Sequence, residues 1–184
     1  MGRPTMGRSK SRSVVLRQQL TQHLDAAFNL AYWLVENKQD GEDLVQEAFM
    51  KALLYEESYQ GGDLRAWILT IVRNCVYSHY HRREKSKLED SYDESTSELT
   101  SPIPNPEHFV AMKFEWEHVQ TVLLEIPLEY REALLLHEME GYSYKEISEI
   151  TGAPIGTVMS RLSRARSLLS QQLQSRKTDS GAKQ

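Results

Sequence analysis

The apolar residues of this chain recur every three or four positions almost throughout, which is the spacing of an amphipathic α-helix. The first half carries three such segments: one over about residues 14–36, a second that begins after Asp40, and a third from an N-cap at Asp63 to about residue 83. We find no alternation of apolar and polar residues long enough to indicate a strand. The pattern therefore predicts an all-α protein.

The composition then changes and divides the chain in two. The stretch EKSKLEDSYDESTSELTSPIPNPE is acidic, rich in Ser and Pro and poor in apolar residues, which is typical of a solvated linker. Helical periodicity resumes near Pro106, breaks at Ile126-Pro127 and ends at Gly141, and two short helical segments follow. The predicted organisation is a disordered basic tail (1–13), a first small helical domain (14–86), a flexible acidic linker (87–105), a second small helical domain (106–174) and a disordered tail (175–184).

The last two helical segments carry the signals of a helix-turn-helix. The residues SYKE, from Ser143 to Glu146, have the spacing of a capping box at a helix start. Gly152 suits a tight turn, and Pro154 suits the first turn of the next helix. That next helix has an apolar stripe at Val158, Leu162, Ala165 and Leu169. Its other side carries Thr157, Ser160, Ser163, Arg164 and Ser167, with Arg161 at the margin.

An outer face of small hydroxyls and arginines is what a helix in the DNA major groove requires, because small side chains allow close approach and arginine donates to phosphate or guanine. An ordinary amphipathic surface helix would look similar. The absence of any carboxylate between Gly152 and Lys177 favours the DNA interpretation.

The third predicted helix combines a buried stripe with aromatic and basic residues. Leu64, Ile68, Ile71 and Cys75 form the stripe, flanked by Trp67 and Val72. The residues roughly opposite or beyond are Arg73, Asn74, Tyr77, Tyr80, Arg82 and Arg83. Aromatic rings among cations suit an unpaired nucleic-acid strand, whose bases stack while its phosphates are neutralised. The alternative is that the tyrosines pack on neighbouring helices.

The net charge of −4, from 26 acidic and 22 basic residues, conceals an uneven distribution. Basic residues prevail in 1–13, 61–87 and 152–184, and acidic residues prevail in 14–60 and 88–151. Because local patches set the field that a partner meets, the two later basic segments predict two DNA contacts. The acidic part of the first domain predicts a partner of another kind.

The number of cysteines and the length of the apolar runs narrow the class of protein further. A single cysteine, Cys75, excludes an internal disulfide framework and fits a reducing compartment. No apolar run approaches the roughly 20 residues of a membrane span, and no apolar segment follows the basic N-terminus as in a secretory signal. We therefore expect a cytoplasmic protein without membrane insertion.

The second domain resembles the promoter-recognition domain of bacterial sigma factors, above all those of the extracytoplasmic-function (ECF) group, over LLEIPLEYREALLLHEMEGYSYKEISEITGAPIGTVMSRLSRARSLL. The first domain is similar to the same group in DGEDLVQEAFMKAL and LRAWILTIVRNCVYSHYHRR. The resemblance implies an alternative sigma factor that binds core RNA polymerase and directs promoter-specific initiation. It also implies a dissociable subunit without catalysis or a cofactor of its own, and an anti-sigma factor as a possible partner.

The resemblance assigns three sets of residues. Docking on a coiled coil of the largest polymerase subunit is implied for Asp43, Leu44, Gln46 and Glu47. Recognition and melting of the minus-ten element are implied for Arg73, Asn74, Tyr77, Tyr80, Arg82 and Arg83. Reading of the double-stranded minus-thirty-five element is implied for Thr157, Ser160, Arg161, Ser163 and Arg164. After GTV the family usually has Lys or Arg, whereas Met159 stands here, so a cationic DNA contact is missing or replaced by an apolar one.

Three other functions are compatible with parts of the sequence. A conventional helix-turn-helix regulator would need a ligand-binding or phosphoacceptor domain, for which residues 14–83 are too short and too purely helical. A helical adaptor without a DNA role leaves both basic segments unexplained. A metalloenzyme could use His79, His81 and His137, but the first two are two residues apart and do not share a helix face.

Overall fold

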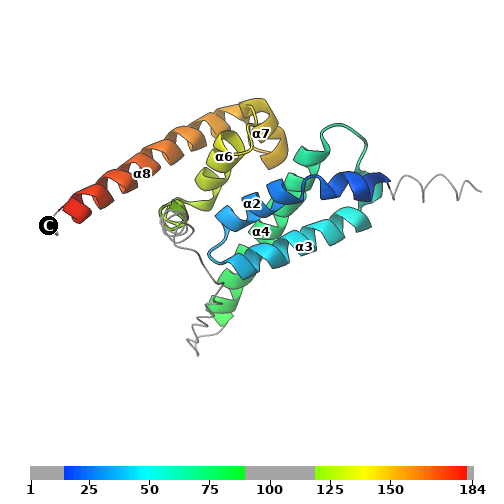
Figure 1. The fold of residues 1–184 in the computed structure, drawn as a ribbon, viewed down its shortest axis with the longest axis horizontal. Helices are drawn as coiled ribbons and strands as arrows, with labels where there is room; N and C mark the ends of the chain where they lie inside the picture. The colour runs from blue at the N-terminus through cyan, green and yellow to red at the C-terminus, as the bar shows by residue number, and fades with distance from the viewer. Residues whose placement is uncertain (1–14, 90–118, 182–184) are drawn as a thin grey trace, which may run out of the picture.

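The computed structural model of the chain describes residues 15–89 and 119–181 (Figure 1). All regular structure within these two ranges is helical, which confirms the all-α prediction. The elements are a helical segment over 15–21, α2 (Leu24–Leu34), α3 (Lys38–Leu54), a 3-10 turn η1 (Glu56–Ser58), α4 (Leu64–Glu89), a helical segment over 119–124, α6 (Leu128–Glu138), α7 (Tyr144–Thr151) and α8 (Ile155–Gly181).

The prediction of one continuous helix over 14–36 is wrong, because the chain turns at residues 22–23. The turn is held by the His23 N–H, which donates to the Leu20 carbonyl at 3.0 Å. Leu16 and Leu20 before the turn join a small cluster with side chains of α3 and α4, whereas α2 after the turn joins the main core. The turn thus lets the two segments bury their apolar residues in different places.

Side-chain caps set where α3 and α4 begin. Asn37 caps α3, its Oδ1 accepting from the Asp40 N–H at 2.8 Å, so this helix starts before the predicted position. Asp63 caps α4 as predicted, since its Oδ1 accepts from the N–H groups of Arg65 at 2.9 Å and Ala66 at 3.1 Å. Each cap satisfies N–H groups that have no partner inside the helix.

Two helices run further than the sequence predicted. α4 continues to Glu89, into the segment expected as linker, and α8 continues to Gly181, through most of the expected C-terminal tail. Neither extension meets a proline, and glycine appears only at the end of α8, so nothing local stops helix propagation. The rest of the predicted linker, 90–105, and the basic tail, 1–13, lie outside the described residues.

The second unit, α6 to α8, forms the predicted helix-turn-helix. The capping box is complete: Ser143 Oγ accepts from the Glu146 N–H at 3.3 Å, and the Glu146 carboxylate accepts from the Ser143 N–H at 2.8 Å. Gly152 ends α7 with φ +71°, a left-handed conformation that favours glycine. In α8 Val158, Leu162 and Ala165 are buried, which confirms these three positions of the predicted apolar stripe, and the fourth, Leu169, is half-buried.

The two helical units also pack against each other, which the sequence did not predict. One continuous core cluster joins buried residues of α2, α3 and α4 with those of α6, α7 and α8. α6 lies against α2, and α7 lies against α4, while most of α8 projects away from the first unit (Figure 1). The arrangement described here is therefore a closed one. Within the described ranges, no helix is both long and apolar enough to span a membrane.

Candidate nucleic-acid interface

The predicted docking residues of α3 are divided between the surface and the core. Asp43 and Gln46 are exposed. Glu47 is half-buried and forms ion pairs with Lys51 at 2.6 Å and with Arg82 at 3.5 Å. The hydrogen bond from Lys51 holds the pKa of Glu47 below its usual value. Leu44 is only 3% exposed and belongs to the main core, because it lies about 100° around the helix from Asp43.

Sequence reasoning missed two apolar residues on the outer face of α3. Met50 and Leu54 are exposed, Leu54 by 74%. They follow Asp43 by seven and eleven residues, which places them on one stripe with Asp43 and Gln46. The signal that would have found them is the recurrence of apolar residues at helical spacing along a face otherwise assigned as polar.

On α4, two of the residues predicted to read a melted strand, Arg73 and Tyr77, are occupied by contacts with α6. Arg73 Nε lies 2.6 Å from Glu132 Oε1, and its guanidinium stacks on the Tyr77 ring with 4.4 Å to the ring centroid. The Tyr77 hydroxyl donates to Glu132 Oε2 at 2.9 Å. Glu132 itself is 0% exposed, and this burial raises its pKa despite the nearby guanidinium.

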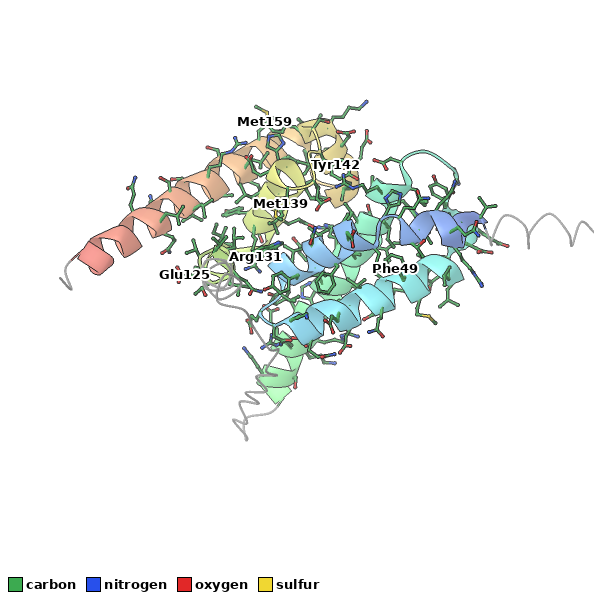
Figure 2. The ribbon with its side chains drawn as sticks, in the orientation of Figure 1. Phe49, Glu125, Arg131, Met139, Tyr142 and Met159 are labelled. Atoms are coloured by element: carbon green, nitrogen blue, oxygen red, sulfur yellow. The ribbon has the colours of Figure 1, made fainter. Side chains whose placement is uncertain are left out.

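Tyr80 has a packing role in this arrangement. Its hydroxyl donates to the Leu34 carbonyl at 2.8 Å and accepts from Arg131 Nη2 at 3.3 Å. Arg131, 3% exposed where α6 meets α2 (Figure 2), also donates to the carbonyls of Leu34 at 2.9 Å and Leu123 at 3.1 Å. Burial lowers the pKa of Arg131. The tyrosine therefore fits the packing alternative, and Arg131 is an interface residue that sequence reasoning missed.

The remaining candidates on α4 lie at the surface. Asn74 is exposed, and its side-chain oxygen accepts from Arg73 Nη1 at 3.1 Å. Arg82 pairs with Glu47 of α3, and Arg83 pairs with Glu36 at 3.0 Å. The two arginines are thus balanced by acids of the same unit.

The predicted outer face of α8 is present as one surface. Ser160, Ser163 and Arg164 are exposed, and Thr157 and Arg161 are half-buried. Two apolar residues of this helix are also exposed, Ile155 and Met159, of which Met159 lies on the outer side (Figure 2) and is 53% exposed. Arg164 Nη1 donates to the Tyr130 hydroxyl at 2.9 Å and so is oriented by α6.

The three histidines considered as metal ligands have partners within the chain, His81 with the Glu84 carboxylate at 3.7 Å. His79 Nε2 lies 3.5 Å from the Asp40 carboxylate, and His137 Nδ1 lies 2.8 Å from the Tyr142 carbonyl oxygen. Among the residues that the structure describes, no three His, Cys, Asp or Glu side chains gather as a metal site would need. His79 thus lies beside α3, His137 is bound to the turn that follows α6, and His81 is exposed next to Glu84 of its own helix.

A helix-turn-helix with an arginine-bearing outer helix, joined to a second helical unit with an aromatic and basic helix, defines a DNA-binding transcription protein. The family model of sigma-70 region 2 matches residues 20–86, and that of sigma-70 region 4 matches residues 117–169. The chain belongs to the extracytoplasmic-function group of bacterial RNA polymerase sigma factors.

Three relatives illustrate the similarity. The chain is 34% identical over 148 residues to the ECF sigma factor SigE of Mycolicibacterium smegmatis, a match of 80% of this chain and 57% of the relative. It is 37% identical over 135 residues to EcfG of Rhodopseudomonas palustris, covering 73% and 71%. Among solved structures, the sigma factor RpoE in complex with the anti-sigma factor NepR from Bartonella quintana matches with a TM-score of 0.69 and 31% identity, covering 85% and 95%. The chain thus spans little more than half the length of the mycobacterial relative.

Proposed function

We propose that the chain is an alternative sigma factor that binds core RNA polymerase and directs promoter-specific initiation. The observation that carries this proposal is the presence of two arginine-bearing helices, α4 and α8, in a chain whose α3 presents an acidic and apolar face. The proposal places the protein in the bacterial cytoplasm as a specificity subunit without catalysis of its own.

Residues 20–86 form the polymerase-binding and minus-ten unit in this proposal. The outer face of α3 docks on the polymerase through Asp43, Gln46 and Glu47, with Met50 and Leu54 extending the contact. An exposed apolar stripe beside acids suits a protein partner better than DNA, since phosphates repel carboxylates. α4 receives the melted strand through Arg73, Asn74, Tyr77, Arg82 and Arg83.

The second unit reads the minus-thirty-five duplex through the exposed face of α8. Ser160, Ser163 and Arg164 supply hydroxyl and guanidinium donors, and Thr157 and Arg161 flank them. Replacing Arg164 with Ala should weaken duplex binding by about 1–3 kcal/mol, the range for a lost bidentate base contact. Arg17→Ala is the matched control, because it removes an exposed arginine from the other unit. Equal footprints for both variants would argue against this placement of α8.

An anti-sigma factor belongs to the proposal as a regulatory partner. The Bartonella relative was solved in complex with one, and this chain matches that relative over most of both lengths. Co-purification of a tagged chain from its own cells, followed by peptide identification, would detect such a partner.

The deciding experiment is run-off transcription with purified bacterial core polymerase on fragments of the source genome. Specific transcripts that appear only with the protein would establish an initiation factor, and their start sites would reveal both promoter elements. DNA binding without such transcripts would favour a conventional helix-turn-helix regulator.

Docking is tested separately with the double variant Asp43→Asn, Gln46→Ala. We expect it to lose assembly with core polymerase while keeping its thermal stability, because both side chains are exposed. The control is Asp25→Asn, Gln18→Ala, which alters the same residue types at exposed positions before and in α2. Wild-type assembly of the first pair would show that the interface lies elsewhere.

A further inference from the structure

The face of α4 that would receive a melted strand is covered by the second helical unit in this structure. Arg73 and Tyr77, the cation and the ring best suited to a phosphate and a base, are both half-buried against α6. A nucleic-acid strand cannot reach the buried Arg73 Nε while Glu132 of α6 lies against it.

Glu132 provides two carboxylate oxygens at this contact, where a bound strand would provide phosphate oxygens. One carboxylate oxygen lies 2.6 Å from Arg73 Nε, and the other accepts the Tyr77 hydroxyl at 2.9 Å. The glutamate is 0% exposed, and its partners are 55 and more residues away in the chain. An anion buried between two units is held there only if it is paired, because an unpaired buried charge is expensive.

Two further polar contacts hold the same closed arrangement. Arg65 of α4 forms an ion pair with the Glu140 carboxylate, and its Nη1 donates to the Glu140 carbonyl at 2.8 Å. Arg131 of α6 donates to the Leu34 carbonyl at the end of α2. Glutamates of the second unit thus face arginines of the first at both ends of the α4 contact.

We infer that the second unit acts as a built-in competitor of the promoter strand, with Glu132 occupying the place of a DNA phosphate. The inference rests on the proposed role of α4 in strand binding. In the closed chain Arg73 forms an ion pair with Glu132 and Tyr77 donates a hydrogen bond to it, so access of a strand requires α6 to leave α4. Binding to the polymerase, which would hold the two units at separate promoter elements, then also unmasks the strand-binding face.

The test compares Glu132→Gln with Glu138→Gln in the full chain. Both changes remove one negative charge from α6, but Glu138 is exposed and pairs with Arg166 inside the second unit. The measurements are the radius of gyration by small-angle scattering and the affinity for a short, labelled single-stranded oligodeoxynucleotide of random sequence, by fluorescence anisotropy. We expect Glu132→Gln to expand the chain and tighten strand binding about tenfold, within the usual range of coupling between sites.

Glu140→Gln tests the same inference at the second ion pair and covers the case in which the buried substitution impairs folding. We expect it to expand the chain and to tighten strand binding as well. The inference is overturned if the Glu132 and Glu140 variants match Glu138→Gln in both measurements, or if they expand without tighter binding. Run-off transcription with the wild-type chain tests the proposed function independently of this inference. Specific transcripts would support the sigma-factor role even if the Glu132 and Glu140 variants show that the second unit does not compete with the promoter strand.

Discussion

Leu44 offers the sharpest test of how α3 divides between core and docking surface. The family resemblance groups it with Asp43, Gln46 and Glu47, but its side chain is 3% exposed within the main core. Replacing Leu44 with Ala removes three carbons from that core, and large-to-small changes of this kind cost about 2–5 kcal/mol. A central value of about 3 kcal/mol corresponds to roughly 6–12 °C in Tm for a chain of this size.

The assay is thermal and urea unfolding of Leu44→Ala beside Gln46→Ala, together with assembly on core polymerase below the Tm of both. We expect Leu44→Ala to lose stability and to assemble normally while folded, because its side chain faces inward. Gln46→Ala should keep its Tm within the small range of surface changes and assemble more weakly. A Leu44→Ala chain with wild-type Tm that fails to assemble would refute this division, since it would make Leu44 a contact residue.

Three other expectations follow from single contacts. Ser143→Ala removes the capping oxygen of α7 and should lower the free energy of unfolding by about 1 kcal/mol, measured by urea denaturation, with Ser143→Thr as the retaining control. Met159 should sense thymine methyl groups: replacing thymine by deoxyuridine in the minus-thirty-five duplex should weaken wild-type binding but leave Met159→Ala unchanged. Burial raises the pKa of Glu132 in the closed chain, so at pH values between its unfolded and its folded pKa the folded chain binds more protons than the unfolded one. The free energy of unfolding of the wild type relative to Glu132→Gln should therefore fall as pH rises across that interval, above which Glu132 is the anion that pairs with Arg73. A difference between the two unfolding curves that does not change with pH would contradict this.

The sequence was sufficient where the determining interactions are short in range. The capping box at Ser143, the cap at Asp63 and the left-handed Gly152 depend on residues two to four positions apart, so the residue types alone predict them. The apolar stripe of α8 was predictable for the same reason, because helical spacing places Val158 and Leu162 on one side.

Contacts between residues far apart in the chain could not be predicted from local sequence patterns. Nothing around Glu132 distinguishes it from a solvated glutamate, and its burial follows only from partners 55 and more residues earlier in the chain. Arg131, beside it, is buried and donates to the Leu34 carbonyl of α2, a helix that the sequence pattern does not place nearby. The turn at residues 22–23 was missed because no Gly or Pro marks it; it is set by which core each leucine-bearing segment joins.

The acidic net charge of a DNA-binding chain is explained by where its carboxylates lie. Arginines of α4 meet acids of both units, through Arg65 with Glu140, Arg73 with Glu132, Arg82 with Glu47 and Arg83 with Glu36. A phosphate that binds these arginines must displace a carboxylate, and the freed carboxylate then attracts a cation from solution. Because salt dependence measures the net release of ions, strand binding by α4 should weaken with salt less steeply than its number of arginines indicates. In the proposed role of α4, the two acids of the second unit, Glu132 and Glu140, thus make strand binding conditional on opening of the chain. On α8 the closed state leaves Arg166 paired with Glu138, whereas Arg164 donates to the neutral Tyr130 hydroxyl.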